Sequence, residues 1–176
     1  WIAAIMILGK LVKIAQTNVT SNQSSVVLSG IDQDSPHLIT YDDVYFDAGD
    51  DLRIRVTTSG TPDSDSEYDQ GQYTMYHDTT HGGSAATNNA QWDVNQSSGT
   101  HTGDANNGSL WLFNFNLSSE FSAVLGWSMG RNTSQTRWGA YTWAGYHSVT
   151  ESNDGIAFHA NGGNNIANGN FCLYRL

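Results

Sequence analysis

The amino-acid sequence predicts an all-β fold, a jelly-roll-like β-sandwich of about ten to eleven short antiparallel strands. Apolar and polar residues alternate with a period of two in many short segments. Clusters of Gly, Asn, Asp, Ser and Thr separate these segments, as turns do. Beyond the N-terminal segment, no stretch combines a helical apolar stripe with helix caps. We therefore expect one sandwich domain over residues 10–176, preceded by a short apolar N-terminal arm over residues 1–9.

The clearest strand pattern is LRIRVT, residues 52–57. Its apolar residues Leu52, Ile54 and Val56 share one face of the predicted strand, and polar residues occupy the other face. NGGNNIANGN, residues 161–170, consists mostly of Gly and Asn and predicts tight turns before the closing strand. Further strands are expected near residues 10–19, 25–31, 38–46, 72–77, 91–95, 110–116, 121–127, 138–149, 155–160 and 171–176.

The segment LWLFNF, residues 110–115, is apolar on both faces. Alternation places Trp111, Phe113 and Phe115 on one face and Leu110 and Leu112 on the other. Such a strand needs cover on both sides, from a second sheet and from either the N-terminal arm or another subunit. The sequence therefore predicts a contact surface formed by Trp1, Ile2, Ile5, Ile7, Leu8, Trp111 and Phe113.

The segment RWGAYTWAGYHSV, residues 137–149, carries aromatic residues on both faces of a predicted strand. Trp138 and Tyr146 share one face, and Tyr141 and Trp143 share the other, with Gly and Ala among them. Small residues beside aromatic rings are typical of sheets that interdigitate, which favours core and interface packing. An exposed ring with amide or carboxylate neighbours would instead suit a stacked sugar. Tyr141 and Trp143 are the candidate carbohydrate-binding residues.

Two short motifs have the residue types of reactive sites without the required context. GWSMG, residues 126–130, matches the nucleophile-elbow pattern around Ser128, yet no helix is predicted after it. HDTTH places His77 and His81 in a predicted loop, without a third ligand at a suitable spacing. We therefore expect no catalytic residues, no cofactor and no metal site.

The acidic run PDSDSEYD, residues 62–69, carries carboxylates at alternate positions. A solvated loop is expected here, and a weak calcium site or subunit-bridging site is the alternative, because carboxylate oxygens are calcium ligands. The EF-hand spacing does not fit, since Tyr68 and Thr74 occupy the places that need Gly and Glu.

The charge balance excludes several classes of partner. Seventeen acidic and seven basic residues give a net charge of −10, which repels phosphate backbones and anionic lipids. We expect neither nucleic-acid nor membrane binding, and the apolar run at residues 1–8 is too short to span a bilayer. Eleven of the acidic residues lie between Asp32 and Asp69, which predicts a strongly negative rim. Cys172 is the single cysteine, so no internal disulfide forms.

Several segments together resemble an uncharacterised group of structural proteins of tailed, especially marine, bacteriophages. They are LGKLVKIAQTNVTSNQSSVVLSGID, LRIRVTTSGTPDSDSEYD, NGSLWLFNFNLSSEFS and NDGIAFHANGGNNIANGNFCLYRL. The resemblance implies a non-enzymatic virion protein with a β-sandwich body on the external surface of the particle. It would serve as a capsid decoration, fibre or tail-appendage subunit and contact other capsid or tail proteins. A homo-oligomer is expected, with a trimer favoured, and the alternative is a lectin-like carbohydrate-binding module for host adsorption.

Overall fold

The computed structural model describes residues 10–95, 98–100, 102–133 and 136–176. The predicted arm over residues 1–9 lies outside the described residues, and so do its contact residues Trp1, Ile2, Ile5, Ile7 and Leu8.

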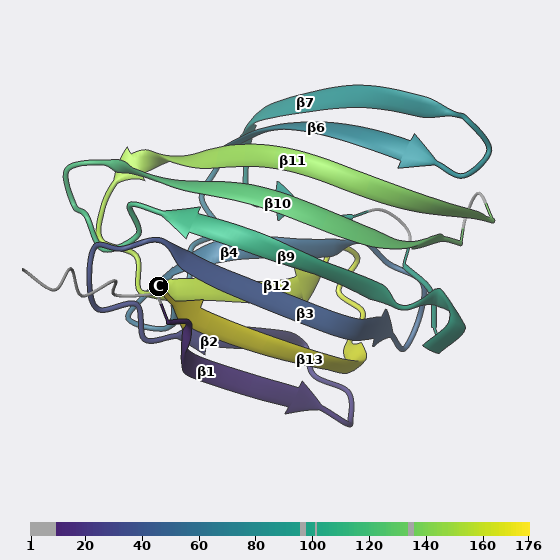
Figure 1. Ribbon diagram of the computed structural model, residues 1–176, viewed down its shortest axis with the longest axis horizontal. Helices are drawn as coiled ribbons and strands as arrows, with labels where there is room; N and C mark the ends of the chain where they lie inside the picture. Colours follow the sequence, from purple (N-terminus) through teal and green to yellow (C-terminus); the bar gives the residue numbers. More distant parts are fainter. Residues whose placement is uncertain (1–9, 96–97, 101, 134–135) are drawn as a thin grey trace, which may run out of the picture.

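The described chain is all-β, as predicted, and its strands form two antiparallel sheets. The large sheet has eight strands in the order β1-β13-β3-β9-β10-β11-β6-β7. The small sheet has the order β2-β12-β4-β5, and β8 also pairs with β4. Figure 1 shows the large sheet across the view, with β7 at its upper edge and β1 at its lower edge. The strands are β1 (Val12–Val19), β2 (Ser25–Ser29), β3 (His37–Phe46), β4 (Leu52–Thr58), β5 (Thr61–Pro62), β6 (Tyr68–Tyr76), β7 (His81–Asn89), β8 (Trp92–Asp93), β9 (Asn106–Phe113), β10 (Phe121–Asn132), β11 (Arg137–Thr150), β12 (Gly155–Ala160) and β13 (Ile166–Arg175).

The path of the chain alternates between the sheets at both ends. Strands β1 to β4 belong in turn to the large, small, large and small sheet, and β12 and β13 belong to the small and large sheet. Between them, β9, β10 and β11 follow one another as antiparallel neighbours. The two-sheet architecture is that of a β-sandwich, and a full jelly-roll topology stays a prediction.

The core fills the space between the two sheets. The apolar face of LRIRVT contributes Leu52, Ile54 and Val56, which are all fully buried, as the alternation predicted. Trp92 on β8 and Trp143 on β11 are the largest buried side chains. Trp92 packs edge-on against Tyr68, with 4.9 Å between ring centroids. Apolar burial on both inner faces thus holds the sandwich together.

Three features differ from the sequence prediction. Strand β7 was not among the expected strands, and its first residue His81 was expected in a loop, yet HGGSAATNN pairs with β6 along most of its length. Residues 161–170 form turns only at their start, because β13 already begins at Ile166. Phe115 is buried rather than sharing a face with Trp111, because Asn114 adopts a φ of 60° and ends the alternation.

Strand β7 is an exposed edge strand of the large sheet. No residue of β7 is buried, so both of its faces and its outer edge meet solvent. An unpaired strand edge of this kind offers free backbone donors and acceptors. None of the residues described by the structure form a helix of the length and apolarity that a bilayer crossing requires.

Candidate functional site

The outward surface of the large sheet carries the most prominent candidate site, an apolar face on β6, β9, β10 and β11. Each of its large apolar side chains is between 36% and 48% exposed, although it lies within a regular strand. We call this surface the apolar face, and its members are Tyr73, Met75, Phe113, Phe121, Leu125, Trp127, Met129, Trp138 and Tyr146.

Strand register explains why these residues gather. On β10, Leu125, Trp127 and Met129 alternate with Gly and Ser, so the large side chains of this stretch point outward. Trp127 lies opposite Thr142 of β11, and Thr142 lies opposite Tyr73 of β6. Leu125 lies opposite Ala144 in the same way. Two ridges of large side chains, on β10 and β6, therefore flank a row of small residues on β11.

The row of small residues forms the floor of a shallow groove. A hollow of about 640 Å³ lies over Gly71, Ala85 and Ala144, with Tyr73 and Leu125 among its walls. A second hollow of about 430 Å³ lies over Ala140, between Trp127, Met129, Trp138 and Met75. The groove thus follows β11 and is lined mainly by apolar groups.

The exposed area of the apolar face is unusually large for a protein surface. A large apolar or aromatic side chain has about 200 Å² of surface in total. From the exposed fractions, the nine residues together leave roughly 700–800 Å² in contact with solvent. The largest apolar patch of a typical monomer is roughly 300–600 Å². An interface of standard size covers about 800 Å² per partner, so the apolar face has the dimensions of a contact surface.

The predicted site residues fall on both sides of the large sheet. Phe113 belongs to the apolar face, and Trp111, half-buried, lies opposite Leu125 on the same side. Tyr141 and Trp143 point into the core instead, and each is only 1% exposed. A sugar needs an accessible ring, and neither Tyr141 nor Trp143 offers one in this structure. The exposed aromatic residues of β11 are Trp138 and Tyr146, which lie on the opposite, outward face of the same strand.

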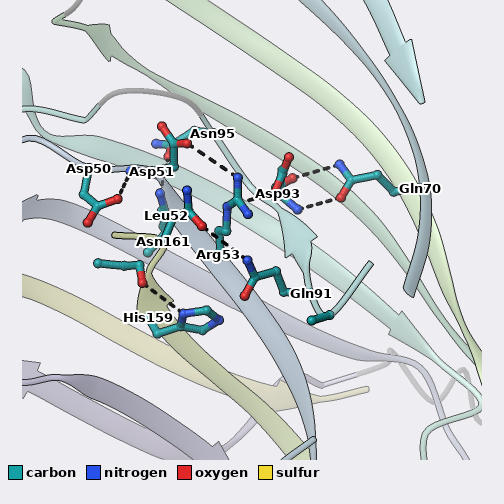
Figure 2. A network of polar contacts seen from close by, with 12 residues as sticks. Asp50, Asp51, Leu52, Arg53, Gln70, Gln91, Asp93, Asn95, His159 and Asn161 are labelled. Carbon is teal, nitrogen blue, oxygen red and sulfur yellow. Dashed lines mark hydrogen bonds and ion pairs between the residues drawn. The ribbon is translucent and has the colours of Figure 1, made fainter. Parts of the chain in front are cut away.

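The outward face of the small sheet is polar by contrast (Figure 2). Arg53 of β4 lies between two carboxylates, with its Nε 3.0 Å from Asp93 and one terminal nitrogen 3.6 Å from Asp51. Burial raises the pKa of the Asp93 carboxyl, and the Arg53 guanidinium opposes that rise. The Gln70 side chain forms two hydrogen bonds with the Asp93 backbone, and the Asn95 side chain accepts one from the Leu52 amide. These contacts fix β8 between the two sheets.

Several acidic residues of the predicted negative rim pair with Asn residues near the start of β13. Asp47 accepts hydrogen bonds from the backbone and side chain of Asn165. These bonds lower the pKa of the Asp47 carboxyl. The Asp50 carboxylate accepts hydrogen bonds from the Gly162 amide and the Asn164 side chain. The Asn-rich segment is therefore shaped by the carboxylates facing it.

The motifs GWSMG and HDTTH lie in ordinary strand and turn positions of the described chain. Ser128 lies in the middle of β10, and its hydroxyl donates a hydrogen bond of 2.8 Å to the Val94 carbonyl. His77 lies in the turn after β6, while His81 begins β7. Ser128 therefore does not stand on the strained strand-to-helix turn of a nucleophile elbow.

A second candidate site lies where the acidic loop before β6 meets the end of β11. His147, which is fully buried, places Nε2 3.1 Å from Asp63 Oδ2 and 3.3 Å from Glu67 Oε2. Desolvation raises the pKa of the Glu67 carboxyl, and the Asp63 carboxylate adds to the rise. The carboxylates of this loop were expected as possible calcium ligands, but His147 was not expected beside them. Strand alternation could have indicated His147, because it lies on the same inward face of β11 as Tyr141 and Trp143.

Comparisons with known proteins find no counterpart. No protein-family model, curated protein or solved structure matches this chain.

Proposed function

We propose that the protein is a non-enzymatic structural subunit of a tailed-bacteriophage particle, displayed on the external surface as a decoration, fibre or tail-appendage subunit. The single structural observation that carries the proposal is the apolar face, on which nine large side chains remain exposed. A structural subunit needs such a surface, because apolar area removed from water is the main driving force of association. The assignment to a virion is supported by the sequence resemblance.

A second copy of the same chain is the proposed occupant of the apolar face. The estimated area of roughly 700–800 Å² comes close to the share of one partner in a standard interface. The net charge of −10 makes unspecific association unfavourable, so contact is favoured only where apolar groups meet. We therefore propose a closed homo-oligomer, and the trimer favoured from the sequence stays a prediction. Neighbouring capsid or tail proteins would then contact the remaining surface.

Membership of the particle is tested by mass spectrometry of purified virions from the phage that encodes the chain. We expect the protein in multiple copies per particle, and an antibody against it should label the particle exterior in electron micrographs. Purified particles that lack the protein, or that bind the antibody only after disruption, would contradict the assignment.

A lectin-like carbohydrate-binding module for host adsorption is the second candidate function. The observation that favours it is the set of exposed rings beside the groove, including Trp127, Trp138 and Tyr73. Gln72, Ser84 and Thr142 also line the groove and offer polar groups to a sugar. A glycan array with wild type, Trp127→Ala and Trp138→Ala distinguishes the two functions. Glycan binding by the wild type that both substitutions abolish would support the lectin function. An array on which the wild type binds no glycan would exclude it.

A further inference from the structure

We infer that Asp63, Glu67 and His147 form a structural binding site for a divalent transition-metal ion, with Zn²⁺ as the best-fitting ion. Within the part of the chain that the structure describes, these residues place one ligand atom each within 4.8 Å of one another. They come from two places, since Asp63 and Glu67 lie on the loop between β5 and β6 and His147 lies on β11. A metal ion there would connect the acidic loop to the large sheet.

The two distances from the histidine nitrogen to the carboxylate oxygens fit a zinc ion. Ligand atoms about 2.0–2.1 Å from a tetrahedral centre lie about 3.3 Å apart. His147 Nε2 lies 3.1 Å from Asp63 Oδ2 and 3.3 Å from Glu67 Oε2, which matches this spacing. Zinc binds both imidazole nitrogen and carboxylate oxygen. Calcium and magnesium prefer oxygen ligands alone, so the ring nitrogen disfavours both.

The buried histidine separates this cluster from an ordinary group of surface acids. The His147 side chain has no exposed surface, and its Nε2 carries at most one hydrogen for two carboxylate oxygens. Its other nitrogen, Nδ1, makes no hydrogen bond with any of the described residues. Glu151 Oε1 is likewise buried without a hydrogen bond to them, 3.8 Å from Nδ1. Histidines that bind zinc usually direct the second ring nitrogen toward such a carboxylate.

The surrounding contacts hold the three ligands in place. The Tyr68 ring packs against the His147 ring with 4.8 Å between centroids. Asp63 Oδ1 accepts the Asp65 amide at 2.8 Å, which leaves Oδ2 directed toward His147. The Ser148 amide donates to the Glu67 carbonyl at 2.7 Å and fixes the loop against β11. The Asp63 and Glu67 side chains are 21% and 31% exposed, so an ion can enter from solvent.

Isothermal titration of the full chain, stripped of metal with a chelator, tests the site with Zn²⁺. We expect one zinc ion per chain, a rise in melting temperature on zinc addition, and no comparable heat with Ca²⁺ or Mg²⁺. Asp63→Asn and Glu67→Gln should each weaken zinc binding by about tenfold or more, because each removes a charged oxygen ligand. Asp63→Asn keeps Oδ1 for the Asp65 amide and so preserves the turn.

Asp65→Asn is the matched control, because it removes the same charge from the same loop while leaving the three ligands in place. It should bind zinc as the wild type does. Melting temperatures without zinc establish that each variant folds. Wild-type protein that binds no stoichiometric zinc, or a control that loses as much affinity as the ligand variants, overturns the metal site. The cluster would then be a polar contact between the buried histidine and two carboxylates without a metal ion.

Discussion

Gly126 lies on the inward face of β10, where any larger residue would collide with the core. It faces Trp143 across the β10–β11 pair. A Cβ atom added at Gly126 would lie 2.2 Å from Trp143 Cε2, 2.4 Å from Nε1 and 2.6 Å from Cζ2. Ordinary carbon contacts need roughly 3.5 Å or more, so the indole ring would have to move by about 1 Å. The Gly126→Ala substitution therefore tests whether the aromatic residues of β11 interdigitate with small residues of β10.

The expected cost follows from the rigidity of the neighbours. Trp143 is almost fully buried in a packed core, so it has little room to give way. Overpacking of a core by an added carbon costs about 1–3 kcal/mol, and this contact belongs at the upper end of that range. For a chain of this length, each kcal/mol lowers the melting temperature by about 2–4 °C. We expect Gly126→Ala to melt roughly 5–10 °C below wild type.

The stability of Gly126→Ala is compared with that of the control Gly71→Ala by urea unfolding and thermal melting. Gly71 lies in β6 of the same sheet but on its outward face, and a Cβ there would have nothing within 4 Å. Gly71→Ala should be neutral or stabilise by up to about 1 kcal/mol, because alanine restricts the unfolded chain. Equal stabilities of the two variants would refute the assigned inward and outward faces of the large sheet.

Two further predictions concern the core and two histidines, of which His37 is buried and His159 is half-buried. Trp92→Ala should lower the free energy of unfolding, measured in urea, by about 3–5 kcal/mol. Trp92 packs on Tyr68, and its Nε1 donates a hydrogen bond of 3.1 Å to the Asp69 carbonyl. A loss below about 1 kcal/mol would contradict the place of Trp92 in the core. Burial lowers the pKa of both His37 and His159 below the usual value of about 6.5, so the unfolded chain takes up protons first as the pH falls. The contribution of these two histidines to stability should therefore be fully present above about pH 6.5 and be lost as the pH falls below it. The loss should be smaller in His159→Gln but unchanged in the exposed control His77→Gln. Equal pH profiles of wild type and His159→Gln would count against the burial of His159.

The alternation of residue types was sufficient to predict the fold class and most strands. LRIRVT placed Leu52 and Ile54 inward, and the structure buries both. Strand β7 escaped prediction because Gly, Ala, Ser and Asn have little intrinsic preference for strands. It forms through backbone pairing with β6, and a single segment does not reveal its partner. The early start of β13 was hidden for a related reason, since Asn168 and Asn170 pair with Asp43 and Asp42 across the sheet.

The candidate sites were harder to predict because they depend on contacts between distant segments. Alternation divided β11 into two aromatic faces, but the sequence did not reveal which face the small sheet covers. Tyr141 and Trp143 turned out to be the covered residues, and Trp138 and Tyr146 the exposed ones. The outward row of β10 followed the same alternation, yet its apolar character became a surface only once β6 and β11 were placed beside it. His147 and Asp63 are 84 residues apart, so no local pattern connects them.

The most direct test of the proposed contact surface is sedimentation velocity at micromolar concentration, comparing wild type with Trp127→Glu and Leu176→Glu. Trp127 lies in the middle of the apolar face, whereas Leu176 is equally exposed at the C-terminal end of the chain, after β13. We expect a homo-oligomer for wild type and for Leu176→Glu, and a folded monomer for Trp127→Glu, because a charge at the centre of an apolar interface is left unpaired. A monomeric wild type, or a Trp127→Glu variant that assembles as well as the wild type, would contradict the role of the apolar face.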